Sequence, residues 1–546
     1  MGHQQLYDHA RYSLRSLFTT INDHIFLQGL TFLLVALLLW RLWRFTISPY
    51  MHPDSPKELP YWIPFIGHGF AFFQSAEILM SKASQYFGNK EPYSLTVFGN
   101  TLYIVTEPHD TTAVYKSDDT LSFEMFVQDL FRSNGYSEHA LGVTYAKLPK
   151  DKAGFPNPQG VSFGSFVKQM HMHQLYPGAN LQVLEDNFRN WFDQRLSLPE
   201  LKRTCSRYST VGTDGSVEML LGQWCSDISI RSGEAAYFGD VLSRINPNLA
   251  DDFLAFDDLG WQVLYQYPSF LSREMNAART KVQRTFKEYL EVPQGQRIAG
   301  GAIWLINAME DEARALGVGN EDIAVLLFNI YWVISTNTRK IAFWMLSNLL
   351  HTPSLLDVVR AETAPAFRGN ELVDLSHLWE HCPQLDNIWH ETLRLCSNAA
   401  SVRRVDQDTV VGGKLLREGN RIMIPYRQLH FDPNVYGADS YRFRPGRFGG
   451  EVTAAANGYS TGKGAVPMTR GPSWRPFGGG KTVCTGRYAA KRATLIFVTM
   501  LLRRFDLEMV GNPPVPEVDL GRPVLGISSF KEGHDFAVKF SLRGKS

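Results

Sequence analysis

The chain lacks the features by which several protein classes are usually recognised. Its 546 residues include only five cysteines, an odd number, and no pair of them is spaced as Cys-x-x-Cys. This argues against a disulfide scaffold or a zinc site. Lys and Arg number 55 against 54 Asp and Glu, so no basic excess indicates nucleic-acid binding. Internal repeats are also lacking.

Long apolar runs are rare too, and the one near the N-terminus is informative. Residues 25–43 are mostly apolar, carry no charge apart from Arg41, and end in Trp40 and Trp43, side chains that suit a membrane interface. With about 20 residues needed to span a bilayer, this predicts a transmembrane anchor after an N-terminal segment at 1–24. A cleaved signal peptide is the alternative, disfavoured because the run starts late and no small-x-small site follows.

The charges around this run bear on its orientation. Arg41 and Arg44 favour a cytosolic C-terminal side, while Arg11 and Arg15 weaken that preference. Residues 44–68 then carry five prolines. From Ser48 onward they predict a stiff hinge that is not helical.

The rest of the chain reads as mainly α with small β-sheets. Residues 92–106 predict a β-hairpin around Gly99-Asn100, and 165–400 read mostly as helices. Residues 449–472 are rich in small side chains and predict a surface insertion.

A nearly all-apolar stretch at 321–346 predicts a helix buried through the middle of the molecule. Asn320 is a candidate cap. The polar run Ser335-Thr336-Asn337-Thr338 interrupts the stretch, and such side chains compete for backbone hydrogen bonds and can open a turn. Two interpretations stay open: a kink satisfied by its own carbonyls, or a polar notch facing a ligand.

A glycine-rich loop near the C-terminus carries a cysteine. It runs from Arg475 to Arg487, with Cys484 between Gly480 and Gly486 and a helical pattern directly after. Backbone N–H groups in such a loop and at a helix N-terminus offset the charge of a thiolate, the form in which cysteine binds a metal. This arrangement suits an axial thiolate on haem iron, which favours O–O cleavage. The alternative is a turn with a structural cysteine.

The loop resembles the haem-binding loop of the cytochrome P-450 family, Phe-x-x-Gly-x-Arg-x-Cys-x-Gly. Phe477, Gly480, Cys484 and Gly486 match that pattern, and Thr482 stands at the Arg position. The resemblance implies haem b with iron on Cys484, and a single catalytic domain over residues 69–546.

Upstream segments match the family in the same order. Glu391-Thr392-Leu393-Arg394 resembles its Glu-x-x-Arg, and the segment Phe443–Phe448 supplies Arg447. Leu429–Pro433 looks like its Leu-His-x-Asp-Pro. The resemblance implies that Glu391, Arg394 and Arg447 form a buried triad that holds the loop.

The polar break resembles the family's oxygen groove, with Asn337 in place of the usual acid and Thr338 retained. Asn337 together with Thr482 looks like the branch that contains cholesterol 7α-hydroxylase and prostacyclin synthase, and the segment 60–68 looks like fungal members. That branch includes hydroxylases and isomerases. Thr338 favours a hydroxylase, because a hydroxyl can position a proton.

Haem propionates need cationic or donor partners, and Thr482 carries no charge. The candidates are Lys481, Arg403, Arg404, and Lys168 or His171 on the preceding helical stretch. One of Arg403 and Arg404 is expected to serve, because the family places a propionate Arg at that spacing.

The resemblance thus implies a haem-thiolate monooxygenase that acts on a large apolar substrate, such as a terpenoid, sterol or alkaloid of secondary metabolism. No flavin domain is evident, so a separate NADPH-cytochrome P-450 reductase is expected, with single-pass anchoring in the endoplasmic reticulum and a cytosolic catalytic domain. Two alternatives remain: a haem-thiolate isomerase or dehydratase that needs no reductase, and a non-catalytic haem sensor.

Overall fold

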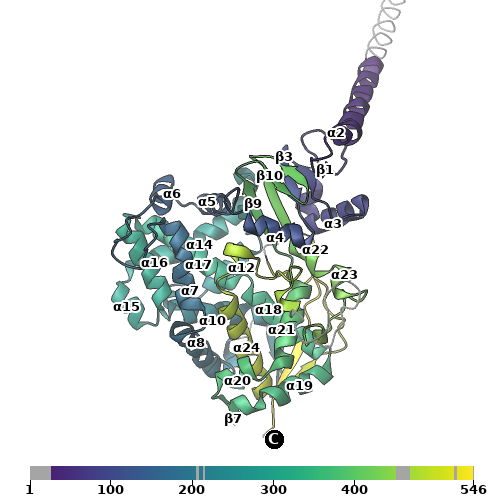
Figure 1. The fold of residues 1–546 in the computed structure, drawn as a ribbon. Helices are drawn as coiled ribbons and strands as arrows, with labels where there is room; N and C mark the ends of the chain where they lie inside the picture. Colours follow the sequence, from purple (N-terminus) through teal and green to yellow (C-terminus); the bar gives the residue numbers. More distant parts are fainter. Residues whose placement is uncertain (1–25, 205–207, 213–214, 450–467, 522–525, 545–546) are drawn as a thin grey trace, which may run out of the picture.

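The computed structural model describes residues 26–204, 208–212, 215–449, 468–521 and 526–544. A long helix leaves the globule at one end, and the C-terminus lies at the opposite end (Figure 1). Most of the insertion predicted at 449–472 lies outside the described residues.

The globule is mainly helical with small sheets, which confirms the predicted fold class. The longer helices of its centre and lower half are α7 (Phe163–Leu175), α8 (Ala179–Arg195), α10 (Leu221–Phe238), α12 (Leu249–Asp257), α14 (Arg273–Glu291), α16 (Trp304–Ala315), α17 (Asn320–Ser335), α18 (Thr338–Leu350), α19 (Pro353–Thr363), α21 (Pro383–Cys396) and α24 (Arg487–Arg504). The other helices are α3 (Gly69–Phe87), α4 (Pro108–Lys116), α5 (Glu124–Ser133), α6 (Glu138–Tyr145), α9 (Leu198–Thr204), α11 (Val241–Ile245), α13 (Trp261–Leu264), α15 (Gln294–Ala299), α20 (Leu375–Glu380), α22 (Tyr426–His430) and α23 (Pro433–Tyr436).

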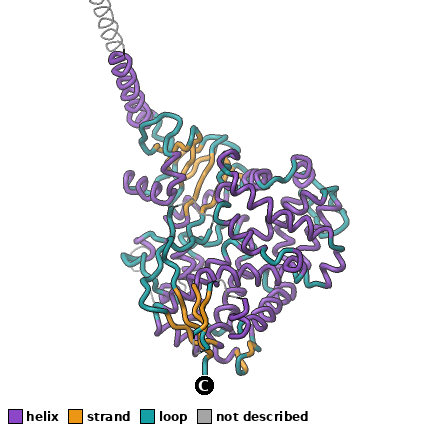
Figure 2. The backbone as a smooth tube through the Cα atoms, turned by 180° about the vertical axis from the view of Figure 1, so that it is seen from behind, coloured by secondary structure: helices purple, strands orange, loops and turns teal. Residues whose placement is uncertain are grey.

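Two larger sheets lie at separate places on the globule (Figure 2). The first has the order β1 (Lys57–Glu58), β2 (Tyr93–Val97), β3 (Asn100–Ile104), β12 (Arg421–Pro425), β9 (Ala400–Val405), β4 (Leu121–Ser122). The second has the order β13 (Phe505–Met509), β14 (Ala537–Leu542), β6 (Val217–Leu220), β5 (Ser209–Val211). Two-stranded ribbons pair β7 (Phe367–Arg368) with β8 (Glu371–Leu372) and β10 (Thr409–Val411) with β11 (Lys414–Leu416).

The predicted hairpin at 92–106 is present as β2 and β3, which pair antiparallel. Phe98 and Gly99 both have positive φ, 47° and 81°, the backbone that a tight two-residue hairpin turn requires. The hairpin places β3 beside β12 and so carries the first sheet toward the site.

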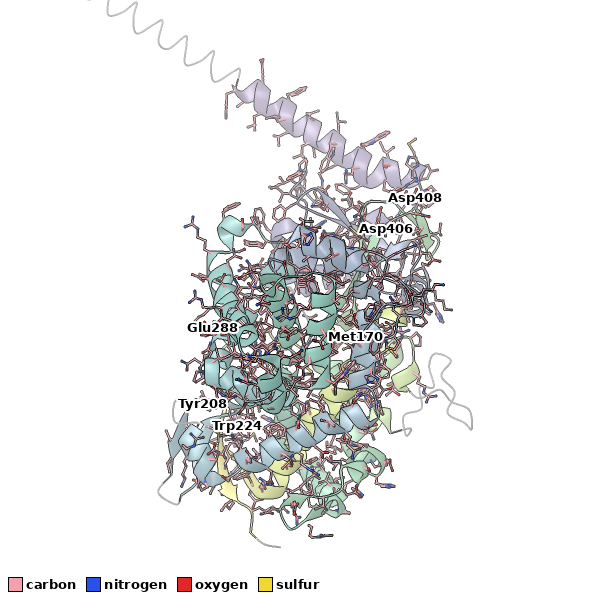
Figure 3. All side chains as sticks on the ribbon, turned by 90° about the vertical axis from the view of Figure 1, so that its left-hand side faces the viewer. Met170, Tyr208, Trp224, Glu288, Asp406 and Asp408 are labelled. Atoms are coloured by element: carbon pink, nitrogen blue, oxygen red, sulfur yellow. The ribbon has the colours of Figure 1, made fainter. Side chains whose placement is uncertain are left out.

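The helical half encloses the main apolar core. Helices α8, α10, α18 and α24 pack against one another in its middle. Met170 and Trp224 are fully buried there, whereas Glu288 lies on an exposed face of α14 (Figure 3). A cysteine loop followed by α24 is thus held against a dense core, which makes its position well defined.

The predicted central helix is confirmed, with its break where the polar run stands: α17 ends at Ser335 and α18 begins at Thr338. The expected cap was wrong. Asn320 is itself the first helical residue, and Gly319 before it is extended and forms no side-chain cap. Glu321 and Asp322 in the first turn still complement the helix dipole.

The N-terminal helix is longer than the sequence predicted. It runs from Phe26 to Met51 and is, among the described residues, the one helix long and apolar enough to cross a membrane. The expectation that the hinge is not helical from Ser48 onward was wrong for Ser48–Met51, whereas residues 52–68 contain no helix. The wide π turn Trp43–Ile47 ends just before Ser48, so Pro49 lies in the first turn of a new segment, where its missing N–H is not needed.

The end of this helix is fastened to the globule rather than loosely joined to it. Arg44 pairs with Glu58 at 2.6 Å between Nε and Oε2. Arg41 donates to the Tyr61 carbonyl and its guanidinium lies 3.9 Å from the centre of the Trp62 ring. Both arginines therefore set the direction in which the helix leaves the first sheet.

Candidate functional site

A cavity of about 470 Å³ lies between the broken central helix and the cysteine loop. Its walls are mostly apolar. The lining residues include Phe123 and Phe126 at the start of α5, Leu264 in α13, and Val333 and Ile334 in α17. Cavities of a few hundred Å³ with few polar groups are typical of sites for apolar small molecules.

Cys484 lines this cavity and reaches it through a tightly folded loop. Its N–H donates to the Phe477 carbonyl at 2.9 Å, and Gly486 directly precedes α24. Burial raises the pKa of the Cys484 thiol, while the N–H groups of Gly486 and Arg487 and the Arg487 charge oppose that shift. These groups favour the thiolate once a metal binds it.

Two glycines of the loop leave room for the neighbouring helix α4 rather than for the cavity. Gly480 has φ +59°, and a Cβ there would lie 2.9 Å from the Tyr115 carbonyl oxygen; a Cβ on Gly479 would lie 2.8 Å from the Tyr115 ring. The loop is therefore pressed against α4. In this structure these glycines serve that packing, a role that the sequence did not indicate.

The structure brings Glu391, Arg394 and Arg447 together, and all three are buried. Arg394 binds Glu391 in bidentate fashion at 2.7 and 2.8 Å, and Arg447 Nε lies 3.3 Å from Glu391 Oε1. The Arg444 N–H donates to the same carboxylate at 3.0 Å. Helix α21 is thus fixed to η4 (Pro445–Phe448) through one carboxylate.

The same cluster is connected to the cysteine loop through His430. Arg394 donates to the His430 carbonyl at 2.9 Å, and His430 Nε2 accepts from the N–H of Arg475, the first residue of the loop, at 3.0 Å. Burial and the charges of Arg394 and Arg427 lower the pKa of His430 to about 3, so the ring is neutral at pH 7.

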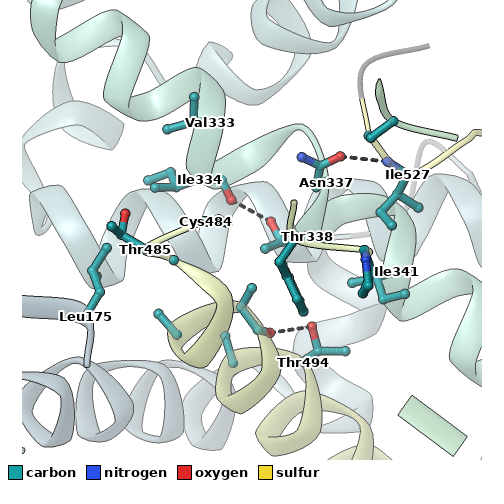
Figure 4. Close-up of a pocket in the computed structure, with 18 of the residues that line it drawn as sticks. Leu175, Val333, Ile334, Asn337, Thr338, Ile341, Cys484, Thr485, Thr494 and Ile527 are labelled. Atoms are coloured by element: carbon teal, nitrogen blue, oxygen red, sulfur yellow. Dashed lines mark hydrogen bonds between the residues drawn. The ribbon is translucent and has the colours of Figure 1, made fainter. Parts of the chain in front are cut away.

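Asn337 and Thr338 lie at the break and both line the cavity, as does Cys484 (Figure 4). Asn337 Oδ1 accepts from the Ile527 N–H at 2.8 Å, which fixes the amide so that its NH₂ group is the free end. Thr338 Oγ1 donates to the Ile334 carbonyl at 2.6 Å. The kink is therefore satisfied by local carbonyls, and both polar side chains also line the cavity; a notch that faces a ligand stays a prediction.

Arg403 and Arg404 lie on opposite faces of strand β9, because successive side chains of a strand alternate between its two faces. Arg404 is exposed and faces Asp406. Arg403 is 1% exposed and donates to Thr482 Oγ1, to Ser401 Oγ at 3.1 Å and to the Val402 carbonyl at 2.7 Å. Thr482, Ser401 and Val402 all line the cavity.

Arg403 is also incompletely satisfied. No carboxylate pairs with it among the described residues, and its Nε has no hydrogen-bond partner there. Burial lowers the pKa of this guanidinium. A buried cation without an anion is costly, so the position fits an anionic group of a bound molecule, as a haem propionate would supply.

The other propionate candidates differ in position. Lys481 is exposed and lies 3.4 Å from Asp118, and Lys168 donates to the Lys481 carbonyl; neither lines the cavity. His171 does line it, and its buried Nε2 is unpartnered. Of the five candidates, the structure therefore brings Arg403 and His171 to the cavity or its wall.

Sequence reasoning missed two contributors. Ile527, whose N–H orients Asn337, comes from a segment nearly 200 residues away in the sequence, and no motif marks it. Tyr426 lines the cavity and its hydroxyl lies 3.1 Å from that of Tyr115, beside the loop. Strand pairing in the first sheet could have suggested the second contact, because Tyr426 directly follows β12.

With this geometry established, the comparisons with known proteins identify the family. The chain belongs to the cytochrome P450 family, whose family model matches residues 230–529. Among solved structures, a retinoic acid-bound cyanobacterial CYP120A1 matches with a TM-score of 0.64, covering 90% of this chain and 99% of that chain at 16% identity. At that identity the likeness concerns the fold alone.

Curated relatives confirm the branch that the sequence indicated. The cytochrome P450 monooxygenase poxD of Penicillium oxalicum is 24% identical over 492 residues, 86% of this chain and 91% of that protein. The human 7-alpha-hydroxycholest-4-en-3-one 12-alpha-hydroxylase is 23% identical over 499 residues, 88% of this chain and 91% of that protein. The chain is therefore an enzyme of the P450 monooxygenase type, with a haem-thiolate centre implied.

Proposed function

We propose that this protein is a membrane-anchored monooxygenase that oxidises a large apolar substrate, a terpenoid, sterol or alkaloid, in secondary metabolism. Its electrons come from NADPH through a separate cytochrome P450 reductase. The observation that carries the proposal is the placing of Cys484 and the Asn337–Thr338 notch on one apolar cavity, with Arg403 buried in its wall.

The residues present fit a haem. The Cys484 thiolate would hold its iron, and Arg403, with His171 as a second candidate, would face its propionates. When bound, the haem supplies oxygen activation at a thiolate-ligated iron. The chain itself supplies orientation, exclusion of water and protons.

Water exclusion follows from the lining. Phe123, Phe126, Val333 and Ile334 offer no hydrogen bonds, so an apolar substrate gains by displacing water from them. Apolar walls also strengthen the few polar interactions at the notch.

The side chains of the notch can donate and accept hydrogen bonds, but neither ionises near neutral pH. The Asn337 NH₂ group is free because its carbonyl is occupied by Ile527, so Asn337 donates a hydrogen bond and relays no proton. The Thr338 hydroxyl donates its hydrogen bond to the Ile334 carbonyl, and its oxygen lone pairs can still accept a hydrogen bond from water. Proton delivery therefore passes through ordered water held by Thr338, with Asn337 orienting that water.

This geometry gives a test by substitution. Thr338→Ala should keep haem and substrate binding, but product per NADPH should fall tenfold or more while hydrogen peroxide rises, because a positioned proton transfer contributes about 10²–10⁴-fold. Asn337→Asp should have a milder effect. Normal product formation by Thr338→Ala with NADPH and reductase would contradict the assigned role.

One observation favours the isomerase alternative. The Thr338 hydroxyl donates to the Ile334 carbonyl in the last turn of α17, and Asn337 cannot act as an acid, as would suit a reaction that needs no proton delivery. Turnover of the purified protein on peroxide or alcohol substrates without reductase would favour it. A spectral titration against sterols and terpenoids, which reports displacement of water from iron, identifies the substrate class and separates both enzymes from a sensor.

The anchor and compartment belong to the same proposal. The helix Phe26–Met51 supports single-pass insertion, and we place it in the endoplasmic reticulum with the catalytic domain in the cytosol. Protease protection of the catalytic domain in sealed microsomes would contradict this orientation.

A further inference from the structure

A buried carboxylate lies directly behind the break in the central helix. Asp257 is the last residue of α12, and its side chain is 2% exposed. It belongs to none of the sequence motifs and does not line the cavity of Cys484. Its surroundings nevertheless connect it to that cavity from two directions.

The first connection is to both sides of the break. From α17, Trp332 Nε1 donates to Asp257 Oδ1 at 3.1 Å, and the side chain of Thr336, between the two helices, helps to lower the pKa of the same carboxylate. From the first turn of α18, Arg339 Nε donates to Oδ2 at 2.8 Å, and Lys340 Nζ lies 3.8 Å from the same oxygen. One carboxylate thus ties α17 to α18 on the side opposite the notch.

At the C-terminal end of α12, the charge of Asp257 does not stabilise that helix. An acidic side chain in the last turn opposes the helix dipole, and burial by itself raises the pKa of a carboxyl group. The charges of Arg339 and Lys340 outweigh burial and bring the pKa of Asp257 to about 2. The carboxylate is therefore ionised and held by donors on the central helix.

The contact is also sterically fitted. A Cβ on Gly260 would lie 2.8 Å from the Trp332 ring, so glycine there leaves room for the indole beside Asp257. Phe256 packs on the other side of Trp332, with ring centres 4.9 Å apart. Trp332 has little freedom to move away from the carboxylate.

The second connection is to the cavity wall. The chain passes from Asp257 through Gly260 into α13 (Trp261–Leu264), and Leu264 and Tyr265 line the cavity. A ligand against Leu264 and Tyr265 therefore touches the segment that begins at Asp257. The same residue holds the helical break that presents Asn337 and Thr338.

From these contacts we infer that Asp257 is a positioning residue: its carboxylate clamps α17 to α18 so that Asn337 and Thr338 keep the geometry of the notch, and it couples that geometry to the α13 wall of the cavity. The inference rests on the proposed function of the notch. Loss of the clamp leaves Cys484 and the cavity in place but loosens the break.

The experiment compares Asp257→Asn with a matched control, Glu310→Gln. Glu310 also forms a buried ion pair, with Arg297 at 2.6 Å, but it lies in α16 away from the notch. Both changes strand buried guanidinium groups. Hydrogen exchange of peptides covering residues 333–341, followed by mass spectrometry, reports the break independently of turnover.

Asp257→Asn should raise exchange in 333–341 at least several-fold, and should increase the peroxide formed per NADPH while the reduced, CO-bound spectrum stays of the thiolate type. Glu310→Gln should lower the melting temperature similarly and leave exchange at 333–341 unchanged. Unchanged exchange in Asp257→Asn, or an equal rise in Glu310→Gln, overturns the inference.

If Asp257→Asn does not fold, Trp332→Phe takes its place, because it removes the Trp332 Nε1 donor to Asp257 and strands no charge. Increased exchange at 333–341 supports the clamp, and unchanged exchange contradicts it. The hydrogen-exchange measurement requires neither reductase nor substrate. A wild-type protein without NADPH-dependent product therefore refutes the proposed function while the exchange result still decides the role of Asp257.

Discussion

Replacement of Glu391 by Gln tests whether the buried triad holds the cysteine loop. The substitution keeps the size of the side chain and removes its charge. In the structure that charge is shared by Arg394 at 2.7 and 2.8 Å and Arg447 at 3.3 Å. Neither guanidinium can turn to water, because both are buried.

The expected cost follows from this geometry. Breaking a buried ion pair by removing one partner costs about 3–5 kcal/mol. Arg447 keeps a second carboxylate, Asp439, at 2.8 Å, whereas Arg394 keeps only carbonyls, so most of the cost falls on Arg394. With an unfolding entropy of about 2 cal/mol/K per residue, about 1 kcal/mol/K for 546 residues, the melting temperature should fall by about 3–5 °C.

The more specific consequence is loss of haem. Arg394 also holds the His430 carbonyl, and His430 holds Arg475 at the start of the loop. We expect little haem-loaded protein, measured by the ratio of haem to protein absorbance, rather than slow turnover by loaded protein.

A matched control separates the triad from a general effect of the substitution. Glu138→Gln makes the same change in an exposed pair with Arg132, where solvent screens the charges, so melting temperature and haem content should stay close to those of the wild type. A haem-replete Glu391→Gln protein that melts with the wild type would refute the reasoning.

Further predictions concern the ligand, the anchor and pH. Cys484→Ser should abolish the thiolate-type spectrum of the reduced, CO-bound protein, whereas Cys396→Ser should not; the reverse result would reassign the ligand. Deletion of residues 1–39, which keeps the Arg41 and Arg44 contacts, should release much of the protein from microsomes with the haem spectrum intact, and full retention would contradict the anchor. The pKa of His430 falls from 6.5 to about 3 on folding, so the unfolded state binds the extra proton and stability falls as pH drops below 6.5. From pH 7 to 5 this loss is about 2 kcal/mol, and urea titrations of His430→Gln should show a correspondingly weaker pH dependence; an unchanged slope would refute it.

Those parts of the fold and site that depend on local patterns could be predicted from the sequence. The hairpin at Gly99, the break before Thr338 and the exposure of Cys484 to a cavity each follow from turn chemistry or a short motif. The choice between Arg403 and Arg404 could not be made, because it depends on which face of β9 is buried, and that is set by pairing with β12.

Where sequence rules failed, the surrounding structure decided the outcome. Proline was expected to end the N-terminal helix before Ser48, yet a π turn accommodates Pro49 and the helix continues to Met51. Asp257 left no sequence signal at all, because a single acid at a helix end is common and its partners Trp332, Arg339 and Lys340 lie in a segment about 80 residues away. Long-range electrostatics of this kind are fixed by the fold.

The substitution of Thr482 for the family's arginine gains a physical explanation from these contacts. An arginine at position 482 would bring a second cation against Arg403, which already donates to the Thr482 hydroxyl, inside a wall where the described residues offer Arg403 no carboxylate. Like charges at that depth repel strongly, whereas a hydroxyl can accept from Arg403 and donate to the Gly479 carbonyl at 3.1 Å. The positive charge at this point of the wall is thus supplied by Arg403 of strand β9, while position 482 of the loop stays neutral. Arg403→Ala should therefore weaken haem retention more than Thr482→Val, which removes the shared hydrogen bond but leaves the cation in place.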